Sequence, residues 1–310
     1  MEYRELGKTG MKVSVLGFGA SPLGGVFGAI DEADGIRAVH VAIERGVNFF
    51  DVSPFYGITK AETVLGKALA TVPRDKFTLS TKVGRYGPTE FDFSAERVTR
   101  SVEESLQRLP IGYIDLILCH DIEFASIEQV VTETIPTLRK LQAQGKVRFI
   151  GVSGLPLKVY REVLGQTDLD TILSYCHYTL NDTSLEELIP TLQAKEVGII
   201  NAAPLSMGLL TQEGPPVWHP APEALQVACR QAAEHCRRQG VDISTLALQF
   251  ALANPVISST FIGMASSEVL VKNLSALESP LDTTLVAEVQ AILQPVRNLS
   301  WPSGRPENNE

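Results

Sequence analysis

Short apolar runs alternate with amphipathic segments along almost the whole chain. Runs typical of buried strands cover residues 15–20, 47–51, 77–82, 114–120, 147–153, 171–176, 197–203 and 259–264. Most of these runs are continuously apolar, as expected for parallel strands that are covered on both faces. The pattern therefore predicts eight buried strands.

Segments with helical spacing of apolar residues separate these runs, for example at 32–46, 94–109 and 126–146. Two of them carry a glycine, Gly46 or Gly145, where the helix is expected to end. Alternation of strands and helices predicts parallel pairing through helical crossovers. Eight repeats without a break in composition favour the α/β class and a closed (β/α)8 TIM barrel.

An open doubly wound sheet is the alternative fold. Such sheets usually have fewer strands and a G-x-G-x-x-G loop after the first strand. Residues 17–25 are rich in glycine but lack that spacing, so the barrel remains the favoured prediction.

Three segments lie outside the repeat. The first 15 residues predict a small β-hairpin around 7–10. About 55 residues separate the seventh and eighth strands, and they predict a proline-rich loop at 210–222 followed by two extra helices. Residues 301–310 are polar and are expected to form a flexible tail, although Trp301 could dock. We expect residues 1–310 to form one domain.

Composition narrows the class of protein. Hydrophobic residues make up 44% of the chain and charged residues 20%, which fits a globular protein with a large core. A net charge of -9 argues against a general nucleic-acid binder. The chain has no signal-like start and no apolar stretch of about 18 residues, so no membrane association is expected. Four cysteines without a C-x-x-C pair predict a reducing, cytoplasmic setting.

Four side chains of catalytic type lie at or just beyond the ends of successive predicted strands. Asp51, Lys82 and His120 close the second, third and fourth strands, and Tyr56 follows the second. Parallel strands end at one rim of a barrel, where such folds carry their chemistry. The four residues together suit proton transfer to or from a carbonyl or alcohol oxygen.

The expected roles follow from charge. The ammonium of Lys82 would lower the pKa of the Tyr56 phenol, which would act as the acid–base group. Asp51 would keep Lys82 charged and oriented, and a neutral His120 would hydrogen-bond the reacting oxygen. Taken singly, each residue has an ordinary structural explanation, such as a turn cap for Asp51 or packing for Tyr56. Their equivalent positions on the strands favour a site.

Longer motifs extend over nearly the whole chain. They are RELGKTGMKVSVLGFGA (4–20), NFFDVSPFYG (48–57), AETVLGKAL (61–69), STKVG (80–84), YIDLILCHD (113–121), GKVRFIGVS (145–153), PLSMGLLT (204–211), FIGM (261–264) and KNLSAL (272–277). This combination resembles the aldo-keto reductase family. The resemblance implies a (β/α)8 barrel, places the family's catalytic tetrad on Asp51, Tyr56, Lys82 and His120, and implies a nicotinamide dinucleotide as cofactor.

The same resemblance implies a cofactor site across the barrel mouth. The implied contacts are Gly19, Ala20, Ser21 and Asp51 near the tetrad, Ser153 and Tyr175 at the nicotinamide, Pro204, Leu205, Ser206, Gly208 and Leu209 at the pyrophosphate, and Ile262, Gly263, Glu268 and Asn273 at the adenosine. Small residues allow backbone N–H groups to approach phosphate, and a helix N-terminus favours an anion.

Three positions depart from the common family pattern. Gly154 stands where many members have Asn, Tyr175 stands where many have Gln, and Ala202 replaces a Tyr that stacks on the nicotinamide. The nicotinamide ring must therefore rest on a different side chain or bind less tightly.

The expected cofactor is NAD, preferred over NADP. Members that choose NADP place Lys or Arg after the last strand to pair with the 2′-phosphate. Residues 263–271 contain no basic side chain and carry Glu268. A carboxylate there would repel phosphate and could accept a ribose hydroxyl.

The expected partner is a small-molecule sugar. The residues expected to line its pocket are Ser21, Phe55, Asp121 and His177, with Trp218 in the 210–222 loop. Polar groups of this kind favour a polyol, although His177 is equally well explained as a hydrogen-bonded core residue. We predict oxidation of a sugar hemiacetal to a lactone, with hydride passing to nicotinamide and the proton to Tyr56.

Other readings remain open. The substrate could be another aldose or aldehyde, Lys82 could form a Schiff base in an aldolase, or the chain could be a non-catalytic nucleotide-binding subunit. The complete tetrad argues against the last two.

No metal is expected, because Cys229, His235 and Cys236 lack standard ligand spacing. Cys119 and Cys176 are expected to be inert packing residues. A monomer or weak homo-oligomer is expected.

Overall fold

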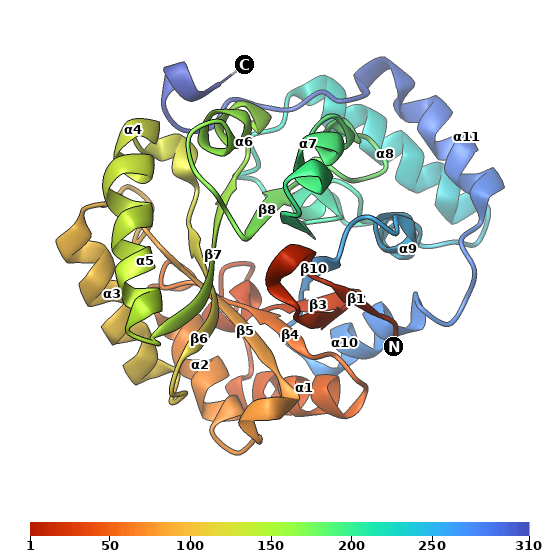
Figure 1. Ribbon diagram of the computed structural model, residues 1–310. Coiled ribbons are helices and arrows are strands. Elements are labelled where there is room, and N and C mark those ends of the chain that lie inside the picture. Colours follow the sequence, from red (N-terminus) through yellow and green to blue (C-terminus); the bar gives the residue numbers. More distant parts are fainter. Residues whose placement is uncertain (310) are drawn as a thin grey trace.

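Eight parallel strands pair around a closed ring in the computed structural model, which describes residues 1–309 (Figure 1). The strands are β3 (Leu16–Gly19), β4 (Phe49–Asp51), β5 (Thr78–Val83), β6 (Ile114–Cys119), β7 (Val147–Gly154), β8 (Thr171–Tyr175), β9 (Gly198–Ala202) and β10 (Ser259–Gly263). β10 closes the ring on β3, from Thr260 opposite Leu16 to Gly263 opposite Gly19. The predicted barrel is confirmed, and the open sheet is excluded.

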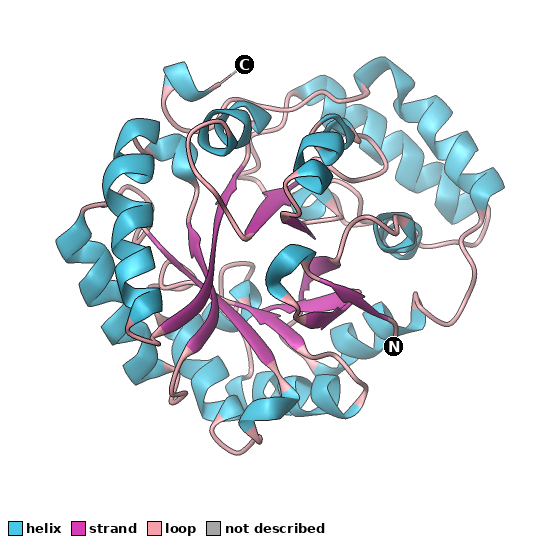
Figure 2. Cartoon of the chain, in the orientation of Figure 1, coloured by secondary structure: helices cyan, strands magenta, loops and turns pink. Residues whose placement is uncertain are grey.

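Helices surround this ring of strands (Figure 2). They are α1 (Glu32–Glu44), α2 (Lys60–Leu69), α3 (Ala95–Arg108), α4 (Ile127–Gln129), α5 (Ile135–Ala143), α6 (Leu157–Leu164), α7 (Ile189–Ala194), α8 (Glu223–Arg238), α9 (Ile243–Ala253), α10 (Ser267–Ser275) and α11 (Thr283–Leu293). The helix predicted at 126–146 is interrupted by a π-helical stretch, Val130–Thr134, between α4 and α5. Side-chain caps begin several helices, as Asp31 does for α1 and Ser94 for α3.

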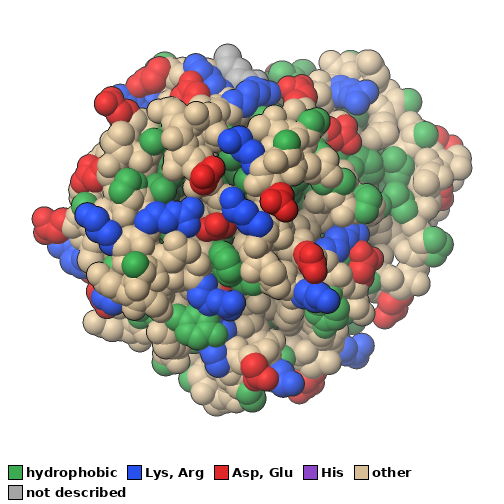
Figure 3. All heavy atoms as spheres, viewed as in Figure 1, with side chains coloured by type: hydrophobic (Ala, Val, Ile, Leu, Met, Phe, Trp, Pro, Cys, Tyr) green, Lys and Arg blue, Asp and Glu red, His purple; other side chains and the backbone are tan. Residues whose placement is uncertain are grey.

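The predicted hairpin closes the amino-terminal end of the barrel. β1 (Tyr3–Glu5) pairs with β2 (Lys12–Ser14) in antiparallel register. Leu6, Met11 and Val13 bury their side chains in a cluster with apolar residues inside the barrel. The opposite rim, where the strands end, is therefore the one available for a site. On the hairpin face, basic and acidic side chains interleave (Figure 3).

The long segment after β9 forms a layer outside the barrel. α8 and α9 are the two predicted extra helices, and α8 lies alongside α11 (Figure 1). Their apolar faces share one cluster, which contains Leu225, Leu246 and Val289. Within residues 1–309, no helix combines the length and apolarity needed to cross a bilayer.

The tail, expected to be flexible, instead packs on the turn after β6. The side-chain amide of Asn308 donates to the carbonyls of Glu123 (2.8 Å) and Ala125 (2.9 Å) and is almost fully buried. The Ser303 hydroxyl donates to Glu123 Oε1 at 2.9 Å. The Trp301 ring lies 4.9 Å from the ring of His219. The tail therefore supplies hydrogen-bond donors to carbonyls that are buried in the turn. Glu310 lies outside the described residues.

Candidate active site

Asp51 and Lys82 form a buried ion pair at the carboxyl ends of β4 and β5. Lys82 Nζ donates to Asp51 Oδ2 at 2.5 Å and to the Val52 carbonyl at 2.9 Å. The lysine side chain is 1% exposed and the aspartate side chain 7%. Two hydrogen bonds inside the barrel therefore fix the position of the ammonium.

The rings of Tyr56 and His120 meet beside this ion pair. Lys82 Nζ lies 4.8 Å from the centroid of the Tyr56 ring. The Tyr56 and His120 rings are edge to face, with centroids 5.6 Å apart. The structure thus brings all four sequence-predicted catalytic residues to one place at the rim.

Close contact between two glycine-containing loops holds Tyr56 there. Gly57 has φ 62°, and a Cβ on it would lie 2.2 Å from the Gly24 carbonyl oxygen. A Cβ on Gly24 would lie 2.6 Å from the Tyr56 carbonyl oxygen. Only glycine at both positions allows the loop after β4 to pack on the turn after β3.

Burial sets the protonation of these groups. Burial raises the pKa of Tyr56 to about 12, although the Lys82 charge and hydrogen bond act to lower it. The predicted lowering effect of Lys82 is present, but the predicted net lowering of the phenol pKa is wrong, because desolvation outweighs the neighbouring cation. Burial, together with the charges of Lys82 and Arg85, lowers the pKa of His120 well below its usual value, so its imidazole is neutral. Burial opposes the charge of Lys82, but Asp51 and Tyr56 raise its pKa and keep it cationic.

The two ring nitrogens of His120 have different environments. Nδ1 lies 3.0 Å from Ser53 Oγ, which accepts a hydrogen bond from the Phe55 backbone N–H at 3.1 Å. With its oxygen accepting from Phe55, the Ser53 hydroxyl can donate to Nδ1, and this favours the tautomer with the proton on Nε2. His120 Nε2 lies 3.7 Å from Asp121 Oδ1. Ser53 was missed by the sequence reasoning, although it lies inside the DVSPFYG motif.

Asp121 lies beside His120 and is paired with an arginine that the sequence reasoning also missed. Arg85 Nη1 donates to Asp121 Oδ2 at 2.5 Å. The Arg85 guanidinium carbon lies 3.9 Å from the centroid of the Phe55 ring, and the Phe55 and His120 ring centroids are 6.0 Å apart. Two expected substrate residues, Phe55 and Asp121, therefore adjoin the tetrad. An arginine three residues beyond the strand-end lysine was the available signal.

Ser21 and His177 are the other expected substrate residues. The structure places Ser21 close to the tetrad and gives His177 polar partners of its own. Ser21 begins the turn after β3, next to Ala20, whose N–H donates to the Asp51 carbonyl at 2.8 Å. His177 instead lies in a polar core pocket: its Nδ1 is 3.0 Å from Asp182 Oδ2 and 3.0 Å from Ser184 Oγ. Its Nε2 is buried and unpaired within residues 1–309. These contacts fit the alternative of a hydrogen-bonded core residue, and contact of His177 with the substrate stays a prediction.

The ends of β7 and β8 carry the expected nicotinamide residues. Ser153 Oγ lies 3.4 Å from both the Asp121 N–H and the Cys119 carbonyl. The Tyr175 hydroxyl donates to Glu123 Oε1 at 3.2 Å, and Tyr175 is the neighbour of Ala202 in the parallel register. An aromatic ring thus stands on the strand adjacent to the position where many family members carry one.

The loop after β9 contains several residues with positive φ values. Ala203, Ser206 and Met207 have positive φ values of 52°, 46° and 52°, and Gly208 has φ 106°. Turns can present backbone N–H groups to an anion, although the N–H groups of Ala203, Ser206 and Gly208 donate to backbone carbonyls of the protein. The expected pyrophosphate contacts Pro204, Leu205, Ser206, Gly208 and Leu209 all lie in or beside this segment.

The expected adenosine end also fits a polar ligand. Ile262 and Gly263 end β10, and Gly19 lies opposite Gly263. Asn273 is buried on α10, and its Nδ2 has no partner within residues 1–309. An orphaned buried amide of this kind is what an adenine nitrogen would satisfy. Glu268 lies in the first turn of α10.

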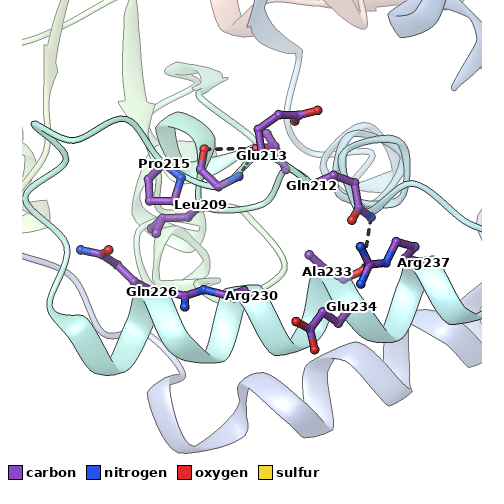
Figure 4. Close-up of a pocket in the computed structure, with 11 residues that line it drawn as sticks. Leu209, Gln212, Glu213, Pro215, Gln226, Arg230, Ala233, Glu234 and Arg237 are labelled. Atoms are coloured by element: carbon purple, nitrogen blue, oxygen red, sulfur yellow. Dashed lines mark hydrogen bonds between the residues drawn. The ribbon is translucent and has the colours of Figure 1, made fainter.

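The loop at 210–222 lies near the mouth but leaves Trp218 partly exposed. The Trp218 side chain is 54% exposed, and its ring centroid lies 6.2 Å from that of Phe27. Behind this loop, a hollow of about 230 Å³ lies between residues 209–215 and α8 (Figure 4). The amide of Gln212 donates to the Ala233 carbonyl at 3.2 Å across it. Leu209 is the one expected cofactor residue that lines this hollow.

The cysteines lie in unreactive surroundings. Burial raises the pKa of Cys119 to about 12 and that of Cys236 to about 11, so both remain thiols. His235 Nε2 lies 2.8 Å from Glu288 Oε2 instead of facing the cysteines of α8. Across residues 1–309, no group of three or more metal-binding side chains is assembled.

Comparisons with known proteins agree with this geometry. Residues 15–294 match the Aldo/keto reductase family. The chain is 52% identical over 317 residues to "L-galactose dehydrogenase" of Arabidopsis thaliana, covering 99% of both chains. It is 33% identical to "D-arabinose 1-dehydrogenase" of Saccharomyces cerevisiae, covering 86% of this chain and 87% of that one.

A solved structure shares the whole fold. It is the aldo-keto reductase AKR11C1 from Bacillus halodurans in its holo form, which is 28% identical to this chain. The two structures superpose with a TM-score of 0.78, and the match covers 100% of both chains. Residues 21–28, 120–124 and 174–180 carry the sequence features that most resemble L-galactose dehydrogenase, in agreement with the 52% identity. Family and relatives confirm an oxidoreductase that acts on CH–OH groups with a nicotinamide cofactor. The chain belongs to the aldo-keto reductase family.

Proposed function

We propose that this protein is an NAD-dependent dehydrogenase that oxidises the hemiacetal of L-galactose to L-galactono-lactone. The observation that carries the proposal is the assembly of Tyr56, His120 and the Lys82–Asp51 pair at one buried point of the rim. The choice of sugar is supported by the full-length 52% identity to a protein of that name. A lactone of L-galactose suits ascorbate biosynthesis, which is the setting we propose.

Each side chain of the tetrad has a defined task. His120 Nε2–H donates to the oxygen on the anomeric carbon and orients the sugar. The phenolate form of Tyr56, a minor species at neutral pH, accepts the hydroxyl proton and becomes the phenol as hydride leaves that carbon for the nicotinamide and a C=O bond forms. Lys82 stabilises the negative phenolate, and Asp51 holds Lys82 in place. When bound, the nicotinamide ring supplies the hydride acceptor.

NAD is the proposed cofactor because carboxylates surround the start of α10. Ser267, its first residue, donates through its hydroxyl to Asp34 Oδ1 at 2.9 Å. Glu268 follows in the same turn. Two cations near α10 are already paired, Arg37 with Asp34 at 3.2 Å and Lys272, in its last turn, with Asp242 at 2.7 Å. A 2′-phosphate here would meet two negative groups, whereas a free 2′-hydroxyl could donate to one.

Several further features belong to the proposal. All four cysteines are free thiols, which supports a reducing cytoplasmic compartment. We also propose one domain, acting as a monomer or weak homo-oligomer.

A panel of aldoses with NAD or NADP, read at the absorbance of reduced nicotinamide, tests this function. We expect NADH formation from L-galactose, with a higher kcat/KM than from D-arabinose or simple aldehydes, and weaker turnover with NADP. Absence of NADH from L-galactose, together with rapid turnover of an unrelated aldehyde, would contradict the choice of sugar.

The panel also separates the remaining alternatives. A Schiff base trapped on Lys82 by borohydride with substrate would instead indicate an aldolase. Nucleotide binding without turnover of any sugar or aldehyde would instead indicate a binding subunit.

A further inference from the structure

The carboxylate of Asp121 is held by one oxygen and leaves the other available. Oδ2 accepts from Arg85 Nη1 at 2.5 Å. Oδ1 makes no hydrogen bond within residues 1–309, and it lies 3.7 Å from His120 Nε2. A free acceptor and a free donor therefore stand side by side at the place where the substrate oxygen is expected.

Arg85 is fixed in position by aromatic rings. Its guanidinium carbon lies 3.9 Å from the Phe55 ring centroid, 5.2 Å from that of Phe91 and 5.3 Å from that of Phe124. The Phe91 and Phe124 rings are themselves stacked, with centroids 4.2 Å apart. The Arg85 side chain is 19% exposed. Cation–π packing on several sides limits its motion and keeps its charge on the Asp121 side.

The backbone of Asp121 is held in a conformation that costs free energy. It has φ 51° and ψ 57°, in the left-handed region that L-residues seldom occupy. Its N–H faces Ser153 Oγ at 3.4 Å, and the following turn begins with Ile122. Such strain persists where the surroundings define it strongly, and here it turns the Asp121 side chain toward Arg85.

Arg85 also acts on the charge of this carboxylate. Burial raises the pKa of Asp121, and the guanidinium opposes that shift through its charge and its hydrogen bond. Without the guanidinium, the effect of burial would raise the pKa of Asp121 further, so the carboxyl would keep its proton more readily. An ionised Oδ1 accepts hydrogen bonds and cannot donate them.

We propose that Asp121 Oδ1, positioned by Arg85, accepts a hydrogen bond from the substrate hydroxyl on the carbon next to the reacting carbon. This inference rests on the proposed function and refines its substrate class to aldoses with a free hydroxyl at C2. The hemiacetal oxygen takes the donor, His120 Nε2, and its neighbour on C2 takes the acceptor. Oxygens on adjacent carbons are close enough to reach two atoms 3.7 Å apart.

The expected consequence is selectivity against 2-deoxy sugars. A substrate without the C2 hydroxyl would bury Oδ1 with no donor. Sites built to hydrogen-bond a hydroxyl discriminate against the analogue lacking it by about 10⁴–10⁵-fold. We expect about 100-fold here, because Oδ1 can retain some contact with water.

The test compares kcat/KM for L-galactose and for its 2-deoxy analogue in wild type, Arg85→Met and Asp121→Asn. We expect each variant to lower the ratio of the two kcat/KM values by at least about tenfold, mainly through a higher KM for L-galactose. The dissociation constant for NAD is measured in parallel by fluorescence. Arg74→Met is the matched control, because Arg74 lies 4.2 Å from the Tyr113 centroid and pairs with Asp115 at the amino end of β6.

Each outcome decides the inference. If Arg85→Met does not fold, Arg85→Lys keeps a cation but loses the planar stacking, and it should lower the ratio by a smaller factor. A wild-type ratio near one, or an unchanged ratio in folded Arg85 and Asp121 variants, would overturn the inference. If wild type oxidises a different aldose from the panel, the proposed sugar fails, and the same comparison with the 2-deoxy form of that aldose still decides the role of Asp121.

Discussion

Strand β6 carries an aspartate near each of its ends, and the two carboxylates are treated differently. At the amino end, Asp115 Oδ1 accepts from Arg148 at 3.0 Å, and Oδ2 accepts from Arg74 and from the Leu79 N–H. Beyond the carboxyl end, Asp121 Oδ2 accepts from Arg85, whereas Oδ1 accepts no hydrogen bond from the described residues and lies 3.7 Å from His120 Nε2. The first carboxylate is saturated by the protein, whereas the second keeps an oxygen for a ligand.

The packing of the arginines is similar at the two ends of β6. Arg74 lies over aromatic rings much as Arg85 does, 4.2 Å from the Tyr113 centroid and 4.7 Å from that of Phe77. The difference lies in the carboxylate oxygens: both oxygens of Asp115 accept hydrogen bonds, whereas Asp121 Oδ1 accepts none from the described residues and lies 3.7 Å from His120 Nε2. In barrels, the lower end serves stability and the upper end chemistry.

Removing the Tyr56 hydroxyl should have the largest effect at the rim. Tyr56→Phe leaves the ring and its packing but removes the proton acceptor, so we expect kcat to fall by about 10³–10⁴-fold. The dissociation constant for NAD should stay within about twofold. Steady-state kinetics and nucleotide titration measure the two quantities. Tyr3→Phe, near the opposite end of the barrel, is the control, and full activity in Tyr56→Phe would reject the assigned role.

Glu123 has one carboxylate oxygen with several hydrogen-bond donors and one without a partner. Its protonation should make the stability of the fold depend on pH. Its Oε1 accepts from Tyr175, from Ser303 and from the Leu155 N–H at 3.3 Å, whereas Oε2 is buried without a partner in the described chain. Burial, with the charge of Asp121, raises its pKa to about 8. The folded protein thus keeps a proton that the unfolded chain releases near pH 4.5.

Stability should therefore fall as pH rises from about 4.5 through about 8. Glu123→Gln removes this titration, and between pH 5 and 9 the wild type should lose on the order of 4 kcal/mol of unfolding free energy relative to the variant. Denaturant unfolding at several pH values measures it, with Glu128→Gln as the exposed control. Parallel pH curves for wild type and Glu123→Gln would contradict the expectation.

At the saturated end, a substitution should affect stability and spare chemistry. Asp115→Ala leaves Arg74 and Arg148 without their partner, and we expect a loss of about 3 kcal/mol in unfolding free energy, at the lower end of values for buried pairs because both arginines reach solvent. The kcat of the folded fraction should change by less than about twofold. Chemical denaturation and active-site titration separate the two effects. A large fall in kcat at unchanged stability would break the contrast between the two ends.

The sequence predicted the barrel well because its strands are buried on both faces. The run at 114–120 corresponds to β6, Ile114–Cys119, and the run at 77–82 to β5, Thr78–Val83. Once strand order is known, the convergence of Asp51, Lys82 and His120 follows from their places at the strand ends. Local pattern and topology are sufficient for that part of the site.

Features that join separate loops could not be read from the sequence. Arg85 and Asp121 are 36 residues apart and meet through the left-handed backbone of Asp121. The docked tail depends on the buried amide of Asn308, which polar composition alone does not reveal. The net direction of the Tyr56 pKa shift depended on burial, a quantity that only the packed structure supplies.

The smallest predicted effect concerns the proton on His120. Ser53→Ala removes the hydroxyl that favours the Nε2–H tautomer, so part of the imidazole population would present an acceptor to the substrate oxygen. A lost hydrogen bond of about 1.4 kcal/mol corresponds to about a tenfold fall in kcat, with little change in NAD affinity. Ser259→Ala, whose hydroxyl bonds the Ser14 carbonyl at the other end of the barrel, is the buried control. If Ser53→Ala retained full kcat, the Ser53 hydroxyl would not be what sets the tautomer of His120. The bound substrate would then set it.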